Sequence, residues 1–127
     1  MEVSLSKTVL VVDDSASMRQ MVAFTLKSAG LAVIESANGQ EALSKLTAPL
    51  RVDLIITDLN MPVMDGLTFI RQARGKPNLR FTPILMLTTE SQESRKMEGK
   101  AAGATGWIVK PFQPEQLLKV IQKVMPA

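Results

Sequence analysis

The chain has 127 residues, with fifteen lysines and arginines against twelve acidic residues, and it contains no cysteine, histidine or tyrosine. This length suits one domain, and an apolar content of 46% predicts a folded core. The missing residue types exclude disulfides, cysteine–zinc sites, thiol nucleophiles and histidine acid–base chemistry, so any reaction rests on carboxylates, hydroxyls, lysine, arginine or a bound ion. The charge of +3 is scattered among acids, which favours a solvated surface over nucleic-acid binding.

Strand and helix patterns alternate along the whole chain. Short apolar runs predict strands at 8–12, 31–36, 54–57, 82–88 and 106–109. Apolar residues at helical spacing predict helices between Ser15 and Gly30 and over 39–46, 67–74, 91–102 and 114–124. Ser15 and Asn38 are the expected caps of the first two helices. Gly99 lies inside the fourth helix and should weaken it by about 1 kcal/mol relative to alanine.

Five strands alternating with five helices predict a parallel sheet with helices on both faces and right-handed crossovers. Since no repeat, linker or low-complexity stretch interrupts the pattern, we expect a single domain over residues 1–127. The apolar run 9–12 ends at Asp13 and Asp14, so it is too short for a signal peptide or a membrane helix. We therefore expect a soluble, cytoplasmic protein.

Polar residues stand where ligands bind in open α/β sheets, at the carboxyl ends of the strands. Asp13 and Asp14 follow the first predicted strand and Asp58 follows the third. Thr88 ends the fourth strand and Lys110 follows the fifth. Three carboxylates held together repel one another unless a cation lies between them. A set of oxygen ligands that leaves room for water favours Mg²⁺ over an all-protein Ca²⁺ site.

Each of these residues also has an ordinary structural explanation. An aspartate after the first strand caps the next helix, and Asp58 starts a turn. Thr88 caps a helix, and Lys110 is an exposed surface charge. Each explanation suffices for one residue, but four strands that all end in such residues at one edge point to a site.

These residue types permit phosphoryl transfer to a carboxylate. Asp58 is then the nucleophile and forms an acyl phosphate. Mg²⁺ neutralises charge, while the Thr88 hydroxyl and the Lys110 ammonium bind phosphoryl oxygens. Such a transfer needs little acid–base work from the protein, which suits a chain without histidine.

Four segments carry a resemblance to a known family: VLVVDDS at 9–15, DLNMPVMDG at 58–66, LMLTTE at 85–90 and AGATGWIVKPF at 102–112. With these segments in this order, the chain resembles the receiver domains of two-component response regulators, and closely the single-domain chemotaxis receivers of the CheY family. The resemblance implies an α/β, doubly wound (βα)5, flavodoxin-like fold. It also implies a parallel five-stranded sheet of order 2-1-3-4-5.

The resemblance further implies a metal site and a phosphoryl donor. Asp13, Asp14, Asp58 and the backbone carbonyl of Asn60 are the implied Mg²⁺ ligands. Asp58 takes the phosphoryl group from a phosphohistidine of a sensor histidine kinase, of the CheA type in chemotaxis. The protein is thus a phosphoacceptor that assists its own phosphorylation and slow autodephosphorylation, and is not an enzyme in the usual sense.

Other residues acquire roles only through the resemblance. Thr88 and Lys110 sense the phosphoryl group, and the Lys110–Pro111 peptide is expected to be cis. The side chains of Asn60 and Glu90 are expected to tune how fast the phosphoryl group is hydrolysed.

Two positions depart from the family pattern. The switch position of the fifth strand is usually tyrosine or phenylalanine, whose ring turns inward when the threonine hydroxyl moves to the phosphoryl group. Here it is Trp107, whose ordinary explanation is packing at the sheet edge. The fourth helix begins Ser91-Gln92-Glu93, where motor-binding relatives carry lysines, so the partner surface is changed.

The resemblance implies a monomer whose output partner docks on the face formed by the fourth helix, fifth strand and fifth helix. The flagellar motor switch is one such partner, and a phosphate sink or relay in a non-flagellar pathway is the alternative. Gly99 should make the fourth helix easy to shift. No membrane contact is expected.

Other classes of protein fit less well. A flavodoxin needs a phosphate-binding loop after the first strand, where Asp13 and Asp14 would repel an anion. An aspartate-nucleophile phosphohydrolase has a second aspartate at the position of Asn60 and a cap domain. A DNA-binding regulator needs a helix-turn-helix beyond the five strands. A receiver that never takes phosphate would lack part of the acidic set.

Overall fold

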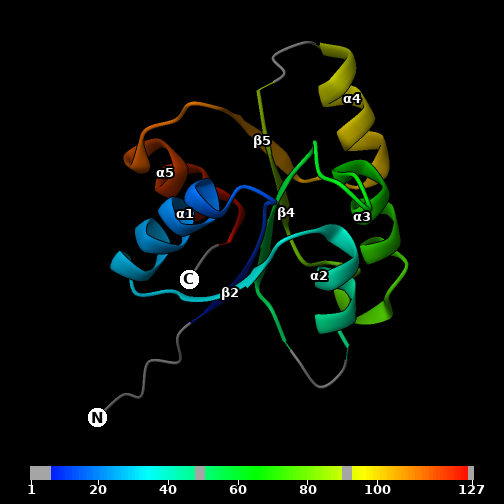
Figure 1. The fold of residues 1–127 in the computed structure, drawn as a ribbon, viewed down its shortest axis with the longest axis horizontal. Coiled ribbons are helices and arrows are strands. Elements are labelled where there is room, and N and C mark those ends of the chain that lie inside the picture. The colour runs from blue at the N-terminus through cyan, green and yellow to red at the C-terminus, as the bar shows by residue number, and fades with distance from the viewer. Residues whose placement is uncertain (1–6, 48–50, 90–92, 126–127) are drawn as a thin grey trace.

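The computed structural model describes residues 7–47, 51–89 and 93–125 as an α/β fold (Figure 1). The strands are β1 (Thr8–Val12), β2 (Ala32–Ser36), β3 (Leu54–Asp58), β4 (Ile84–Thr88) and β5 (Gly106–Val109). The α-helices are α1 (Ala16–Ser28), α2 (Gly39–Lys45), α3 (Gly66–Arg74), α4 (Glu93–Ala102) and α5 (Pro114–Val124). A short 3-10 helix, η1, covers Pro77–Leu79. No helix in these ranges is both long and apolar enough to cross a membrane.

All strand pairs are parallel and the sheet order is β2-β1-β3-β4-β5, which confirms the expected doubly wound fold. Helices α1 and α5 lie on one side of the sheet, and α2, α3 and α4 on the other (Figure 1). Each face has its own apolar cluster, one around Phe69 and one around Leu26. Strands buried on both faces need continuous apolar runs, which is why the runs in the sequence predicted them.

The predicted caps form as expected. The Ser15 hydroxyl accepts from the Met18 N–H at 3.3 Å, and the Asn38 side chain accepts from the Glu41 N–H at 2.8 Å. Both helices therefore start directly after the carboxyl ends of β1 and β2. This arrangement turns the chain back over the sheet and leaves the strand ends at one edge.

The predicted bounds of β1, β5 and α5 are confirmed, and other element boundaries differ from the predictions by one or two residues. Strand β4 begins at Ile84 instead of residue 82, because Pro83 lacks the N–H that a ladder requires, although its carbonyl accepts from the Ile55 N–H. Strand β2 begins after Leu31, whose N–H bonds back to Leu26 at the end of α1. Helix η1 was not predicted, since three residues show no periodicity. The predicted start of the fourth helix at 91–92 lies outside the described residues.

Candidate functional site

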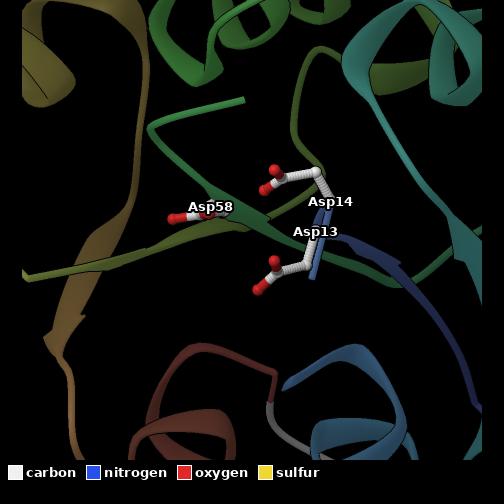
Figure 2. Close-up of side chains that lie close together, drawn as sticks. All are labelled: Asp13, Asp14 and Asp58. Carbon is white, nitrogen blue, oxygen red and sulfur yellow. The ribbon is translucent and has the colours of Figure 1, made fainter. Parts of the chain in front are cut away.

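Three carboxylates meet at the carboxyl edge of the sheet. Asp13 and Asp14 follow β1, and Asp58 is the last residue of β3, which pairs with β1 in parallel. One oxygen of each carboxylate lies within 4.8 Å of the others. Figure 2 shows the three side chains projecting to the same side from the ends of the two strands. Residues 45 positions apart in the sequence thus form one acidic cluster.

The two inner carboxylates are oriented by backbone N–H groups. Oδ1 of Asp13 accepts from the Ser15 N–H at 2.9 Å, and Oδ1 of Asp58 accepts from the Leu59 N–H at 2.9 Å. The backbone carbonyl of Asp13 accepts from the Arg19 guanidinium at 2.6 Å. Asp13 is 1% exposed and Asp58 7%, whereas Asp14 is exposed. The cluster therefore has two fixed, buried members and one open to solvent.

Lys110 brings one positive charge to the cluster from β5, which is separated from β3 by β4. Its Nζ lies 3.2 Å from Oδ1 of Asp58 and 3.5 Å from Oδ2 of Asp13. The Lys110 N–H donates to the Thr88 carbonyl at 2.7 Å, and the Lys110–Pro111 peptide is cis. The lysine is thus tied to the end of β4 while its ammonium reaches the carboxylates.

The electrostatics of the cluster are unfavourable without a further cation. Oδ2 of Asp13 is buried without a hydrogen bond among the described residues, and its contact with Lys110 is at ion-pair distance only. Burial raises the pKa of Asp13; the Ser15 N–H and Lys110 oppose this, and the charges of Asp58 and Asp14 add to it. Three carboxylates against one ammonium leave two net negative charges. This donor set fits a divalent ion with oxygen ligands.

The loop after β3 is folded back against the site by Gly66. Its N–H donates to the Leu59 carbonyl at 2.8 Å, and a Cβ on this residue would lie 2.3 Å from the backbone oxygen of Asp58. In the sequence, Gly66 stands only as the residue before the helix predicted over 67–74. The close approach that requires glycine involves residues eight apart, and the sequence pattern gives no signal for it.

The same loop contains a strained turn that the sequence does not predict. Val63 has φ of 71°, and the Met64 N–H bonds to the Pro62 carbonyl at 2.7 Å across it. A positive φ is unfavourable for a β-branched residue, because its side chain crowds the backbone. Strain of this kind concentrates at functional sites.

The other predicted residues surround the cluster or lie apart from it. Asn60 is exposed in the loop directly after Asp58, and Thr88 is buried at the end of β4. Trp107 is half-buried on β5 and packs with the apolar cluster on the α3 and α4 side of the sheet. Glu90 lies outside the described residues. The structure therefore brings Asp13, Asp14, Asp58 and Lys110 into direct proximity, with Thr88 at the end of the adjoining strand and Asn60 in the adjoining loop.

Comparisons with known proteins agree with this geometry. The family described as response regulator receiver domain matches residues 9–122. Chemotaxis protein CheY1 of Helicobacter pylori is 38% identical over 117 residues, which is 91% of this chain and 94% of that protein. The structure of chemotaxis response regulator CheY4 of Vibrio cholerae is 55% identical, with a TM-score of 0.90 over 94% of this chain and 99% of that one.

A third neighbour bears on the acidic cluster. The receiver domain of a Pseudomonas aeruginosa sensor histidine kinase is 27% identical, with a TM-score of 0.88 over 97% of this chain and 100% of that one. Its structure has a magnesium ion coordinated in the active-site cleft. Receiver domains are phosphoacceptors that take phosphoryl groups from histidine kinases. The chain belongs to the response regulator receiver family and is a CheY-like receiver of two-component signalling.

Proposed function

We propose that this chain is a single-domain, chemotaxis-type response regulator whose Asp58 accepts a phosphoryl group from a phosphohistidine kinase. The observation that carries this proposal is the position of Asp58. It ends the central strand β3, lies within 4.8 Å of two further carboxylates, and is 3.2 Å from the ammonium of Lys110. It is thus a buried, oriented carboxylate beside a positive charge.

The transfer needs one bond to form and one to break. An Asp58 carboxylate oxygen bonds to phosphorus, and the phosphorus–nitrogen bond of the donor phosphohistidine breaks. The electron pair stays with the imidazole, which takes up a proton from water. The product is an acyl phosphate on Asp58.

The residues around Asp58 stabilise the charge on the transferring group. Lys110 exchanges its contact with Asp58 for a phosphoryl oxygen, and the Thr88 hydroxyl donates to another. Asp13, Asp14, Asp58 and the Asn60 carbonyl are the groups that would hold Mg²⁺. The ion, when bound, offsets the repulsion between the carboxylates and the incoming phosphoryl group. The magnesium seen in the related receiver supports this assignment.

Two further roles follow from the family resemblance. The Asn60 side chain, which is exposed beside Asp58, and Glu90 would flank the water that hydrolyses the acyl phosphate and so set its lifetime. Trp107 would turn inward as Thr88 engages the phosphoryl group. Slow autodephosphorylation then returns the protein to its resting state.

Phosphoryl uptake is the test of this proposal. We expect label from a phosphorylated CheA-type kinase, or from acetyl phosphate, to appear on the wild-type chain with Mg²⁺ and to be lost in EDTA. Asp58→Asn should take up no label. Asp65→Asn is the matched control: Asp65 caps α3, and asparagine caps a helix equally well. Label that persists in Asp58→Asn or in EDTA would overturn the assignment.

The output surface is proposed to be the face formed by α4, β5 and α5. We place the protein in the cytoplasm as a monomer. The flagellar motor switch is the proposed partner, with a phosphate sink or relay as the second candidate because the family's lysines are replaced at 91–93. Beryllofluoride-loaded protein should bind the purified switch protein, and unloaded protein should bind it weakly. A sink or relay would take label quickly and show no such binding.

A further inference from the structure

One cation–π contact joins helix α4 to the sheet. Nζ of Lys96, in α4, lies 5.2 Å from the centroid of the Trp107 ring on β5, and both side chains are half-buried. An ammonium within about 6 Å of an indole face is attracted to it by the ring quadrupole. None of the ion pairs among the side chains of residues 7–47, 51–89 and 95–125 involves Lys96. Its neighbour Arg95 instead pairs with Glu98 at 3.0 Å.

A second contact seats the same helix on the neighbouring strand. Gly99, one turn after Lys96, is buried, and a Cβ there would lie 2.3 Å from both Sδ and Cε of Met86 on β4. Met86 is the residue that pairs with Trp107 in the sheet register. Helix α4, which shares its side of the sheet with α2 and α3 (Figure 1), therefore rests on one cross-strand pair. Gly99 covers Met86 and Lys96 covers Trp107.

This cross-strand pair is directly connected to the site. Alternate residues of a strand point to the same face, so Thr88 shares the face of Met86 and lies diagonally opposite Trp107. Three residues after Trp107, the Lys110 N–H donates to the Thr88 carbonyl. Met86, the partner of Trp107, lies two residues before Thr88, and Trp107 lies three residues before Lys110. A change in the position of the Trp107 ring therefore acts close to both site residues.

We propose that Lys96 is a positioning residue that holds Trp107 in its half-exposed orientation and so opposes the switched state. The inference rests on the proposed function, in which phosphorylation of Asp58 draws the ring inward. Inward rotation removes the indole from the ammonium, so the contact stabilises the unphosphorylated state only. By thermodynamic linkage, a contact that stabilises the resting state lowers the affinity for every ligand that prefers the switched state. Loss of Lys96 should therefore tighten binding of a phosphoryl mimic roughly two- to five-fold, the factor expected for a half-exposed cation–π contact.

The test uses Lys96→Gln, with Lys96→Arg as the conservative variant that keeps the cation. Lys100→Gln is the matched control, since it removes the same charge from the next turn of α4. Because Trp107 is the sole tryptophan, intrinsic fluorescence reports on this ring alone. Each variant is titrated with beryllofluoride in saturating Mg²⁺, and acrylamide quenching is measured in the metal-free protein.

We expect Lys96→Gln to lower the beryllofluoride midpoint roughly two- to five-fold and to change the quenching of Trp107. Lys96→Arg and Lys100→Gln should match wild type in both, and thermal unfolding should show that all variants are folded. A midpoint for Lys96→Gln equal to that of Lys100→Gln would overturn the inference. A wild-type chain that neither responds to beryllofluoride nor takes up label would overturn the proposed function. In that case, acrylamide quenching of Trp107 still tests the contact, and unchanged quenching in Lys96→Gln would refute the positioning role.

Discussion

The two edges of the sheet use positive charge in opposite ways. At the carboxyl edge, Lys110 faces carboxylates whose charge it only partly balances. At the amino edge, Arg74 donates to the carbonyls of Gly103 at 2.9 Å, Leu79 at 2.7 Å and Thr82 at 2.6 Å. These carbonyls belong to the loops that lead into β4 and β5. The carboxyl edge keeps an excess of negative charge that a bound cation can balance. At the amino edge, the guanidinium of Arg74 is already hydrogen-bonded to backbone carbonyls.

The difference separates function from stability. Burial lowers the pKa of Arg74, and its hydrogen-bond partners are backbone carbonyls of neighbouring loops, so the guanidinium holds those loops together. The carboxyl edge instead holds a buried carboxylate oxygen of Asp13 without a hydrogen bond and a strained turn at Val63. Natural proteins tolerate such features where a bound ligand relieves them. Four substitutions test this difference between the two edges.

Removing Arg74 should have the largest effect. Arg74→Met removes the guanidinium donors of the buried or half-buried carbonyls of Leu79, Thr82 and Gly103, and we expect the free energy of unfolding to fall by about 2–4 kcal/mol, with or without Mg²⁺. Denaturant unfolding measures this. Arg71→Met, one turn earlier on the exposed face of α3, is the control and should change stability by less than about 0.5 kcal/mol. Equal losses for the two variants would show that the amino edge is not held by Arg74.

Removing Lys110 should have a smaller effect that depends on the metal. Lys110→Met leaves three carboxylates unbalanced, so we expect a loss of about 1–2 kcal/mol in EDTA and a smaller loss in saturating Mg²⁺. Unfolding curves under both conditions test this against Lys119→Met, which alters an exposed lysine of α5. A loss that Mg²⁺ does not reduce would mean that Lys110, like Arg74, serves only to hold the fold.

Relieving the strained turn should stabilise the protein slightly. Val63→Asn places a residue that tolerates positive φ in the turn, and we expect a gain of about 0.5–1 kcal/mol, which raises the melting temperature by a few degrees. Val63→Ala keeps the unfavourable φ for a residue with a Cβ and is the control. If both variants melt like wild type, the turn stores no strain that matters for stability.

The pH dependence of Asp13 should give the smallest change. The raised pKa means that the folded state holds this proton more tightly than the unfolded chain does. The contribution of Asp13 to stability in EDTA therefore rises as the pH falls through its raised pKa and is complete below the ordinary value. Mg²⁺ affinity falls over the same range, because the ion needs the carboxylate.

The comparison of wild type with Asp13→Asn isolates this contribution. The free energy of unfolding is measured in EDTA between about pH 4 and 7. The wild-type value minus the variant value should be constant above the raised pKa of Asp13 and should increase as the pH falls below it. Trp107 fluorescence should respond to Mg²⁺ in wild type and not in the variant. Identical pH profiles for the two proteins would show that burial of Asp13 has no energetic consequence.

The sequence alone was enough to predict the alternation of elements and the edge at which the site lies. Apolar runs that end abruptly in Asp13, Asp58 or Lys110 indicate both a buried strand and the polar residue at its carboxyl end. The same pattern therefore predicts the strands and the edge of the sheet where the site lies. The caps at Ser15 and Asn38 were predictable for the same reason, because capping depends on residues three apart. The predicted start of strand β4 was two residues too early, because the apolar pattern does not show that Pro83 lacks the N–H needed for strand pairing.

The tertiary structure decided which charged groups and which closely packed residues meet once the strands and helices are assembled. Arg74 looks like any helix-surface arginine in the sequence, and Gly99 looks like a weak point of its helix instead of the place where α4 meets Met86. The contact between Lys96 and Trp107 and the approach of Gly66 to Asp58 likewise leave no local pattern. Local propensity and periodicity act over a few residues, and these contacts depend on packing between elements that only the complete fold brings together.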